Sequence, residues 1–61
     1  MKFLINAEAF AESKGKYSEF IELYQTYRSF NGTMDSCWMT LCDLFGYEQA
    51  CHIEDISRRD Y

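Results

Sequence analysis

The residues best suited to chemistry are three cysteines and one histidine in the second half of the chain. They follow the pattern Cys37-x4-Cys42-x8-Cys51-His52. Zinc sites usually contain C-x2-C or H-x3-H pairs, whose two ligands reach one ion from a single turn, and this pattern has neither. On a helix, Cys37 and Cys42 lie roughly 140° apart, so they cannot share a metal ion or form a disulfide unless the helix breaks. The pattern predicts reduced thiols, with no metal site and no cofactor.

Catalysis by a thiol is also disfavoured. Cys51 and His52 are adjacent, and adjacent helical side chains point about 100° apart, so they cannot form a nucleophile-base pair. His52 instead shares a helix face with Glu48 and Asp55, which is typical of a solvated polar cluster. A chain of 61 residues buries only about 60% of its unfolded surface, which leaves little room for a substrate cavity. We expect a protein that is not an enzyme and has no catalytic residues.

The overall charge restricts the class of partner. Ten acidic residues against six Lys and Arg give a formal net charge of -4, which disfavours direct binding to nucleic acid or to an anionic membrane. The apolar fraction of 48% predicts one small folded domain over residues 1–61. Lys2 is followed by only three apolar residues, too few for a secretory signal, and no stretch approaches the ~20 apolar residues of a membrane span. With three cysteines, these features indicate a cytoplasmic protein.

Four glutamates in the first half of the chain form the most informative charge pattern. They are Glu8, Glu12, Glu19 and Glu22. On one continuous helix they would fall within roughly 80° of one another and form an acidic ribbon about 21 Å long. One interpretation is mimicry of nucleic-acid phosphates, by which the ribbon would occupy a basic groove of a host protein. The other is an ordinary solvated face of an amphipathic helix.

Some apolar residues lie outside the expected core. Leu23 and Phe30 project near the acidic face, and Met39 lies beside the apolar stripe of its own helix. Apolar residues surrounded by charged ones are typical of contact sites. Five tyrosines exceed what a thin core can enclose, and they either form a recognition surface or cover the core with their hydroxyls in water. The predicted partner-binding residues are Glu8, Glu12, Glu19, Glu22, Leu23 and Phe30.

These features favour a non-catalytic acidic module that binds a protein partner with a basic surface, and self-association is left open. Phages and mobile elements use small acidic proteins of this class as inhibitors or adaptors of host proteins, which is an analogy and not a physical argument. The alternative is a small helix-turn-helix DNA-binding regulator, because residues 41–53 have the outline of two short helices around Gly46. Its second helix offers few groups for base edges, and only Arg58 and Arg59 remain for phosphates.

The elements that position these residues are expected to be helices, because valine is absent and few residues are β-branched. Apolar residues recur at steps of three and four in three segments. The first stripe contains Phe10, Tyr17, Phe20, Ile21, Tyr24 and Tyr27, with Tyr24 in its middle. The second contains Met34, Cys37, Trp38, Leu41, Leu44 and Phe45, and the third contains Ala50, Ile53 and Ile56. We expect an all-α bundle of three or four short helices.

Glycines and caps predict the boundaries. Gly15 either ends a first helix or lies inside one long helix, and Tyr17-Ser18 slightly favours a second start. Residues 31–33 form the clearest boundary, and Gly46 ends the following helix. At the N-terminus, residues 1–5 either form a short extended segment before a helix capped by Asn6, or pack on the helices.

Overall fold

The computed structural model describes the backbone of residues 2–59, and all their side chains except those of residues 33 and 34. Four helices follow one another along the chain, and no strand occurs within this range, which confirms the predicted all-α fold. They are α1 (Lys2–Ser13), α2 (Tyr17–Arg28), α3 (Thr33–Phe45) and α4 (Tyr47–Arg59). None of the described helices combines the length and the apolar character needed to cross a bilayer.

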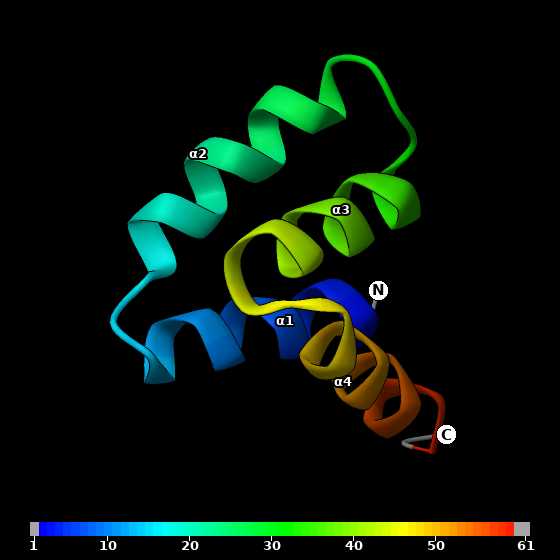
Figure 1. The fold of residues 1–61 in the computed structure, drawn as a ribbon. Helices are drawn as coiled ribbons and strands as arrows, with labels where there is room; N and C mark the ends of the chain where they lie inside the picture. The colour runs from blue at the N-terminus through cyan, green and yellow to red at the C-terminus, as the bar shows by residue number, and fades with distance from the viewer. Residues whose placement is uncertain (1, 60–61) are drawn as a thin grey trace.

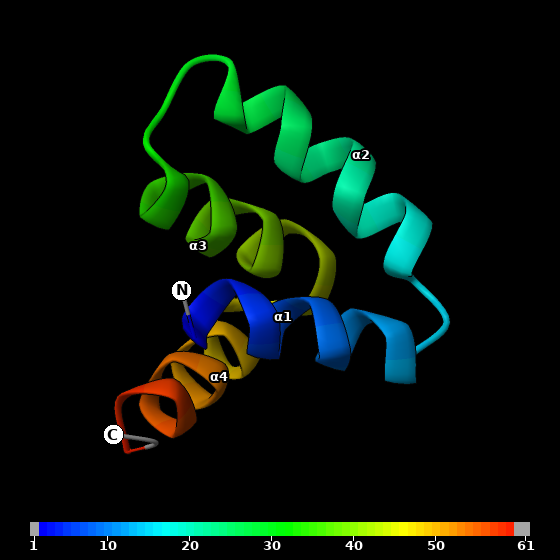
Figure 2. The same cartoon turned by 180° about the vertical axis from the view of Figure 1, so that it is seen from behind.

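Helix α3 lies at the centre of the bundle and contacts the other three helices. In Figure 1, α2 lies above α3, whereas α1 and α4 cross below it. Figure 2 shows the same arrangement from behind. Helix α1 also contacts both α2 and α4, but α2 and α4 do not contact each other within residues 2–59. The domain is therefore held together mainly through α3 and α1.

Of the two interpretations of residues 1–5, the short extended segment is wrong for residues 2–5, which are helical, and Phe3 packs in the core as the other interpretation predicts. Met1 lies outside the described residues. Phe3, Ala7 and Ala11 are four residues apart and all buried. A helix places side chains at this spacing on one face, where they join the core. A lone strand would have left its backbone donors and acceptors without partners, whereas a helix satisfies them internally.

Asn6 lies inside α1 and is not the cap of a helix that begins at Ala7. Its Nδ2 donates a hydrogen bond to Ser57 Oγ on α4, at 2.9 Å. The Ser57 hydroxyl in turn donates to the carbonyl of Ile53, at 2.7 Å. These two hydrogen bonds connect the first and last helices and satisfy a hydroxyl that is almost fully buried.

The chain breaks between α1 and α2 at Gly15, as the two-helix interpretation predicts. Gly15 has φ of +71°, a conformation that residues with a side chain rarely adopt. Its N–H donates to the carbonyl of Glu12 at 3.0 Å, and the N–H of Lys16 donates to the carbonyl of Ala11 at 2.8 Å. This pair of hydrogen bonds is a Schellman motif, which ends α1 and redirects the chain.

The two later boundaries are confirmed. Helix α2 ends at Arg28 and α3 begins at Thr33, with Gly32 as its extended N-cap. Gly46 has φ of +97°, and its N–H donates to the carbonyl of Cys42 at 3.0 Å. The carbonyl of Gly46 accepts from the N–H of Ala50 at 3.1 Å. One glycine therefore ends α3 and starts α4, which gives a tight corner between them.

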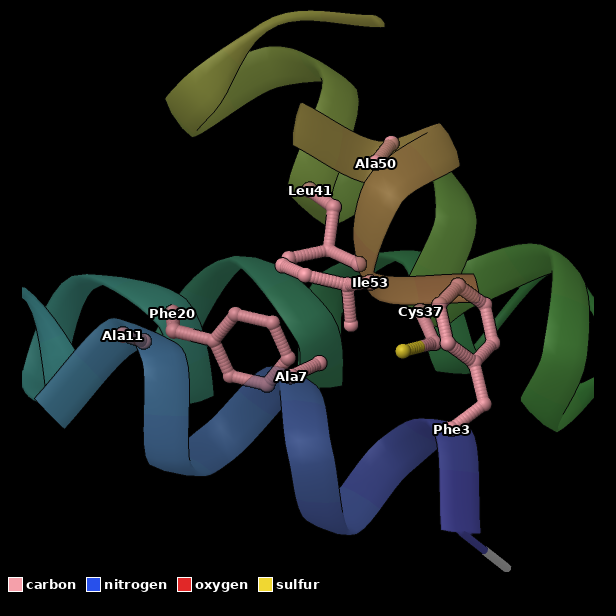
Figure 3. Packing of buried hydrophobic residues seen from close by; sticks show 8 residues of the cluster. All are labelled: Phe3, Ala7, Ala11, Phe20, Cys37, Leu41, Ala50 and Ile53. Carbon is pink, nitrogen blue, oxygen red and sulfur yellow. The ribbon is translucent and has the colours of Figure 1, made fainter. Parts of the chain in front are cut away.

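Eight buried residues from all four helices form the core, and Figure 3 shows their side chains pointing toward one another. They are Phe3, Ala7, Ala11, Phe20, Cys37, Leu41, Ala50 and Ile53. Phe20 and Leu41 are the largest side chains that are fully buried. Tyr24 and Trp38 are only half-buried and pack against this cluster, and Tyr24 stacks on Phe20 with ring centroids 6.0 Å apart. Met34 belongs to the predicted stripe, but its side chain lies outside the described residues.

Replacing Leu41 is expected to destabilise the domain more than replacing an exposed residue of similar size. Leu41→Ala removes a fully buried side chain from the central helix, and we expect a loss of about 3 kcal/mol in the free energy of unfolding. Ile5 is 61% exposed, so Ile5→Ala should change it by less than about 0.5 kcal/mol. Urea unfolding followed by circular dichroism measures both values, and equal effects would show that the core is assigned wrongly.

Two buried serines are expected to respond in opposite directions to alanine substitution. The Ser36 hydroxyl is buried and has no hydrogen-bond partner within the described part of the chain. Ser36→Ala should therefore raise the free energy of unfolding by about 1 kcal/mol, because it removes an unsatisfied polar group. Ser57→Ala should lower it by about 1 kcal/mol, because it leaves Asn6 without its acceptor. Losses of equal size in the two variants would contradict this assignment.

Candidate functional site

The predicted acidic ribbon does not run along one helix. Glu8 and Glu12 lie on α1, whereas Glu19 and Glu22 lie on α2, and the break at Gly15 separates the two pairs. The calculated ribbon requires a continuous helix through this glycine, and that condition is not met. The four glutamates therefore form two separate pairs on different helices.

The second glutamate pair borders a groove between α2 and α3, which we call the acidic groove. Its lining residues are Glu19, Glu22, Leu23 and Thr26 on α2 and Leu44 on α3. The four α2 residues are spaced so that they share one helix face. The groove has a volume of about 280 Å³, which is below the ~300–1,000 Å³ of pockets for drug-sized ligands. Its size suits one or two side chains of a partner better than a small-molecule substrate.

The polar and apolar side chains of this groove differ in how far they are exposed to solvent. The two glutamates are exposed, whereas Leu23 and Leu44 are half-buried. Thr26 Oγ1 donates to the carbonyl of Glu22 at 3.0 Å, so its hydroxyl is satisfied within its own helix. The groove thus offers an apolar surface beside two carboxylates, which can contact the aliphatic part and the charged end of a lysine or arginine.

Lys16 pairs with one carboxylate of the groove and is only weakly held there. Lys16 Nζ lies 3.6 Å from a carboxylate oxygen of Glu19, and both side chains are about half exposed, at 45% and 60%. Exposed ion pairs of this kind contribute only about 0–1 kcal/mol. A cation from a partner can therefore replace Lys16 at little cost.

The two helices that form the groove are joined by a side-chain hydrogen bond. The Tyr27 hydroxyl on α2 donates to the Asp43 carboxylate on α3. This hydrogen bond raises the pKa of Tyr27, because the carboxylate stabilises the protonated phenol. Phe20 is fully buried at the start of α2 and holds that end of the helix against the core. The spacing of the groove walls is therefore fixed by contacts outside the groove itself.

The remaining predicted site residues lie elsewhere. Glu8 is half-buried and its charge acts on the buried Cys37 of α3. Glu12 is exposed on α1, and Phe30 is 81% exposed beyond the end of α2. None of these three lines the acidic groove.

Sequence reasoning missed two groove residues. Thr26 lies seven positions after Glu19 and so on the same helix face, a signal that was available in the sequence. Leu44 was assigned to the apolar stripe of its helix, and its place at the groove depends on how α3 packs on α2.

The three cysteines are free thiols in different environments. Cys37 is buried, and its thiol has a pKa raised to about 12. Burial is the larger cause of this rise, and the nearby negative charge of Glu8 is the smaller one. Cys42 and Cys51 are half-buried, and burial also raises the pKa of Cys42. Within the described residues, no three His, Cys, Asp or Glu side chains are placed to hold one metal ion. His52 is exposed and lines a hollow between α1 and α4.

The cysteines are expected to differ in their reactivity with a thiol reagent. At about pH 8 the Cys37 thiol is buried and protonated, so it should react only after unfolding. Cys42 and Cys51 are partly accessible and should react in the folded protein. Mass spectrometry of peptides after timed labelling, with and without urea, identifies the modified residues. Rapid labelling of Cys37 in the folded protein would contradict the described core.

Comparisons with known proteins give no further guidance on this site. No protein-family model matches the chain, and no curated protein or solved structure matches it either. The function is therefore inferred from the residues and the geometry described above.

Proposed function

We propose that this protein is a non-catalytic interaction module that binds a basic surface of a protein partner through the acidic groove. The observation that carries this proposal is the placement of Glu19 and Glu22 beside Leu23 and Leu44 in one groove between two helices. Its role would be that of an inhibitor or adaptor, such as phages and mobile elements direct against host proteins; this part of the proposal rests on analogy.

The chemistry of the groove favours an arginine or lysine side chain. The leucines can contact the methylene groups of the side chain, and the carboxylates can accept hydrogen bonds from its charged end. Arginine would fit best where both carboxylates engage it, because its guanidinium presents several donors in a fixed plane. A partner with one arginine or lysine in a basic surface would contact both the leucines and the carboxylates of the groove.

The charge of the whole chain supports the same class of partner. A formal net charge of -4 attracts a basic surface over long range and accelerates association. The leucines act only at contact, where they exclude water and slow dissociation. The two parts of the groove therefore have different kinetic roles.

A helix-turn-helix regulator is the alternative function, because α3 and α4 follow each other around Gly46. This connection of one residue is shorter than the roughly three or four residues typical of that motif. The charges on α4 weigh against it. Arg58 pairs with Glu54, and Arg59 Nη2 lies 2.9 Å from a carboxylate oxygen of Asp55. These pairs reduce the positive charge that contacts with DNA phosphates require.

The proposal predicts capture of a basic protein that depends on salt and on the groove. The tagged protein should retain its partner from a cell extract at about 0.1 M salt and release it at about 1 M, where the Debye length falls to about 3 Å. With the recovered partner, surface plasmon resonance should show slower association for the double variant Glu19→Gln/Glu22→Gln. Leu23→Ala should instead show faster dissociation.

The double variant Glu12→Gln/Glu48→Gln is the matched control, since it removes the same charge at exposed positions outside the groove. It should slow association less than the groove variant does, because it loses only the long-range attraction of the net charge. Equal losses in the two double variants would mean that net charge, and not the groove, attracts the partner. Sub-micromolar binding to duplex DNA at physiological salt would favour the alternative function.

A further inference from the structure

A second hollow shares no residue with the acidic groove and combines aromatic rings with carboxylates. The described residues that line it are Phe3 on α1, Asp35 and Trp38 on α3, and Glu54 on α4. Its volume is about 270 Å³. We call it the aromatic hollow. Three helices contribute to it, so it exists only in the folded domain.

Aromatic contacts position the apolar part of the hollow. Phe3 is 3% exposed, and Figure 3 shows its ring within the core close to Cys37. The Phe3 and Trp38 rings are tilted by 52° with centroids 6.0 Å apart. Trp38 also contacts Tyr47 edge to face, with centroids 5.7 Å apart. The indole packs on both rings and is itself half-buried, so its exposed part is the aromatic surface that a ligand in the hollow would meet.

Two carboxylates accompany these rings. Asp35 is exposed in the first turn of α3 and makes no ion pair with any residue that the structure describes. Glu54 is partly buried and accepts two hydrogen bonds from Arg58, including one from Nε at 3.0 Å. Asp35, Glu54 and Arg58 together therefore carry a net negative charge.

The combination of an aromatic ring with two carboxylates favours one chemical class of ligand. Aromatic rings attract cations through their negative faces, most effectively cations that lose little hydration, such as alkylated ammonium groups. Small metal ions need several oxygen ligands, and the hollow offers two carboxylates on separate helices. A neutral apolar ligand would remove the carboxylates from water without giving them a cation or a hydrogen-bond donor, and this costs free energy.

We propose that the aromatic hollow binds an alkylated ammonium group, by contact with the exposed part of the Trp38 ring and by attraction to Asp35 and Glu54. The group could belong to a free small molecule or to a methylated lysine of a protein. The chemistry at the hollow is the same in both cases. This binding is independent of the acidic groove and of the partner proposed for it.

The single tryptophan of the chain lies in the hollow, so its fluorescence reports binding directly. Choline and a short peptide with trimethyllysine serve as the two probes, and 3,3-dimethylbutan-1-ol serves as the uncharged analogue of choline. Both cations should shift the Trp38 emission and its indole N–H resonance, and the neutral analogue should bind about tenfold more weakly. Tighter binding of the peptide than of choline would assign a methylated protein as the source, and the reverse a free small molecule.

Two arginine variants separate the hollow from net charge. Arg58→Gln removes the cation that pairs with Glu54 and should strengthen choline binding by about threefold. Arg59→Gln is the matched control, because it makes the same change of charge but pairs with Asp55, which does not line the hollow. Asp35→Asn should weaken binding by about threefold. Equal binding of choline and its neutral analogue, or the same effect of both arginine variants, would overturn the proposal.

Discussion

The packing of α3 against the other three helices is the interaction on which the rest of the structure depends. Leu41 and Cys37 on this helix are fully buried and lie among core side chains from α1, α2 and α4. Because α2 and α4 do not contact each other in the described range, α3 and α1 must connect them. A chain this short has no second core to compensate for a loss at this position.

Both proposed sites follow from this central position of α3. Leu44 borders the acidic groove on the side of α2, whereas Asp35 and Trp38 border the aromatic hollow shared with α1 and α4. Each site takes its remaining residues from the helices that pack there. In both cases an apolar surface lies beside carboxylates that water still reaches, which is an arrangement suited to binding cations.

The sequence predicted the fold class and most helix boundaries because these depend on residues close together in the chain, namely the spacing of apolar residues and the positions of glycines. Gly15 and Gly46 adopt positive φ angles at the two places where helices end in tight turns. The start of α1 was ambiguous, since Phe3 reads as part of a strand until its spacing to Ala7 is considered. The same spacing places both side chains in the core once the segment is helical.

The candidate site was only partly predictable. Leu23 stood out as an apolar residue beside acids, and it does line a groove with Glu19 and Glu22. A single acidic ribbon that joins this pair to Glu8 and Glu12 requires one continuous helix, and the break at Gly15 interrupts that helix. The meeting of residues distant in sequence depends on helix packing and leaves no local signal. Examples are Leu23 and Leu44, which line the same groove, and the neighbouring rings of Phe3 and Trp38. Sequence patterns therefore identify surfaces of single helices but not the sites between them.

The central claim is that the acidic groove is the surface that receives a basic side chain. The most direct measurement is a nuclear magnetic resonance titration of the ¹⁵N- and ¹³C-labelled protein with a short peptide of alternating arginine and alanine. We expect the largest shifts at the side chains of Glu19, Glu22, Leu23 and Leu44, and smaller ones at the exposed acids Glu12 and Glu48. Shifts spread evenly over all exposed carboxylates, with the methyl groups of both leucines unchanged, would contradict the account.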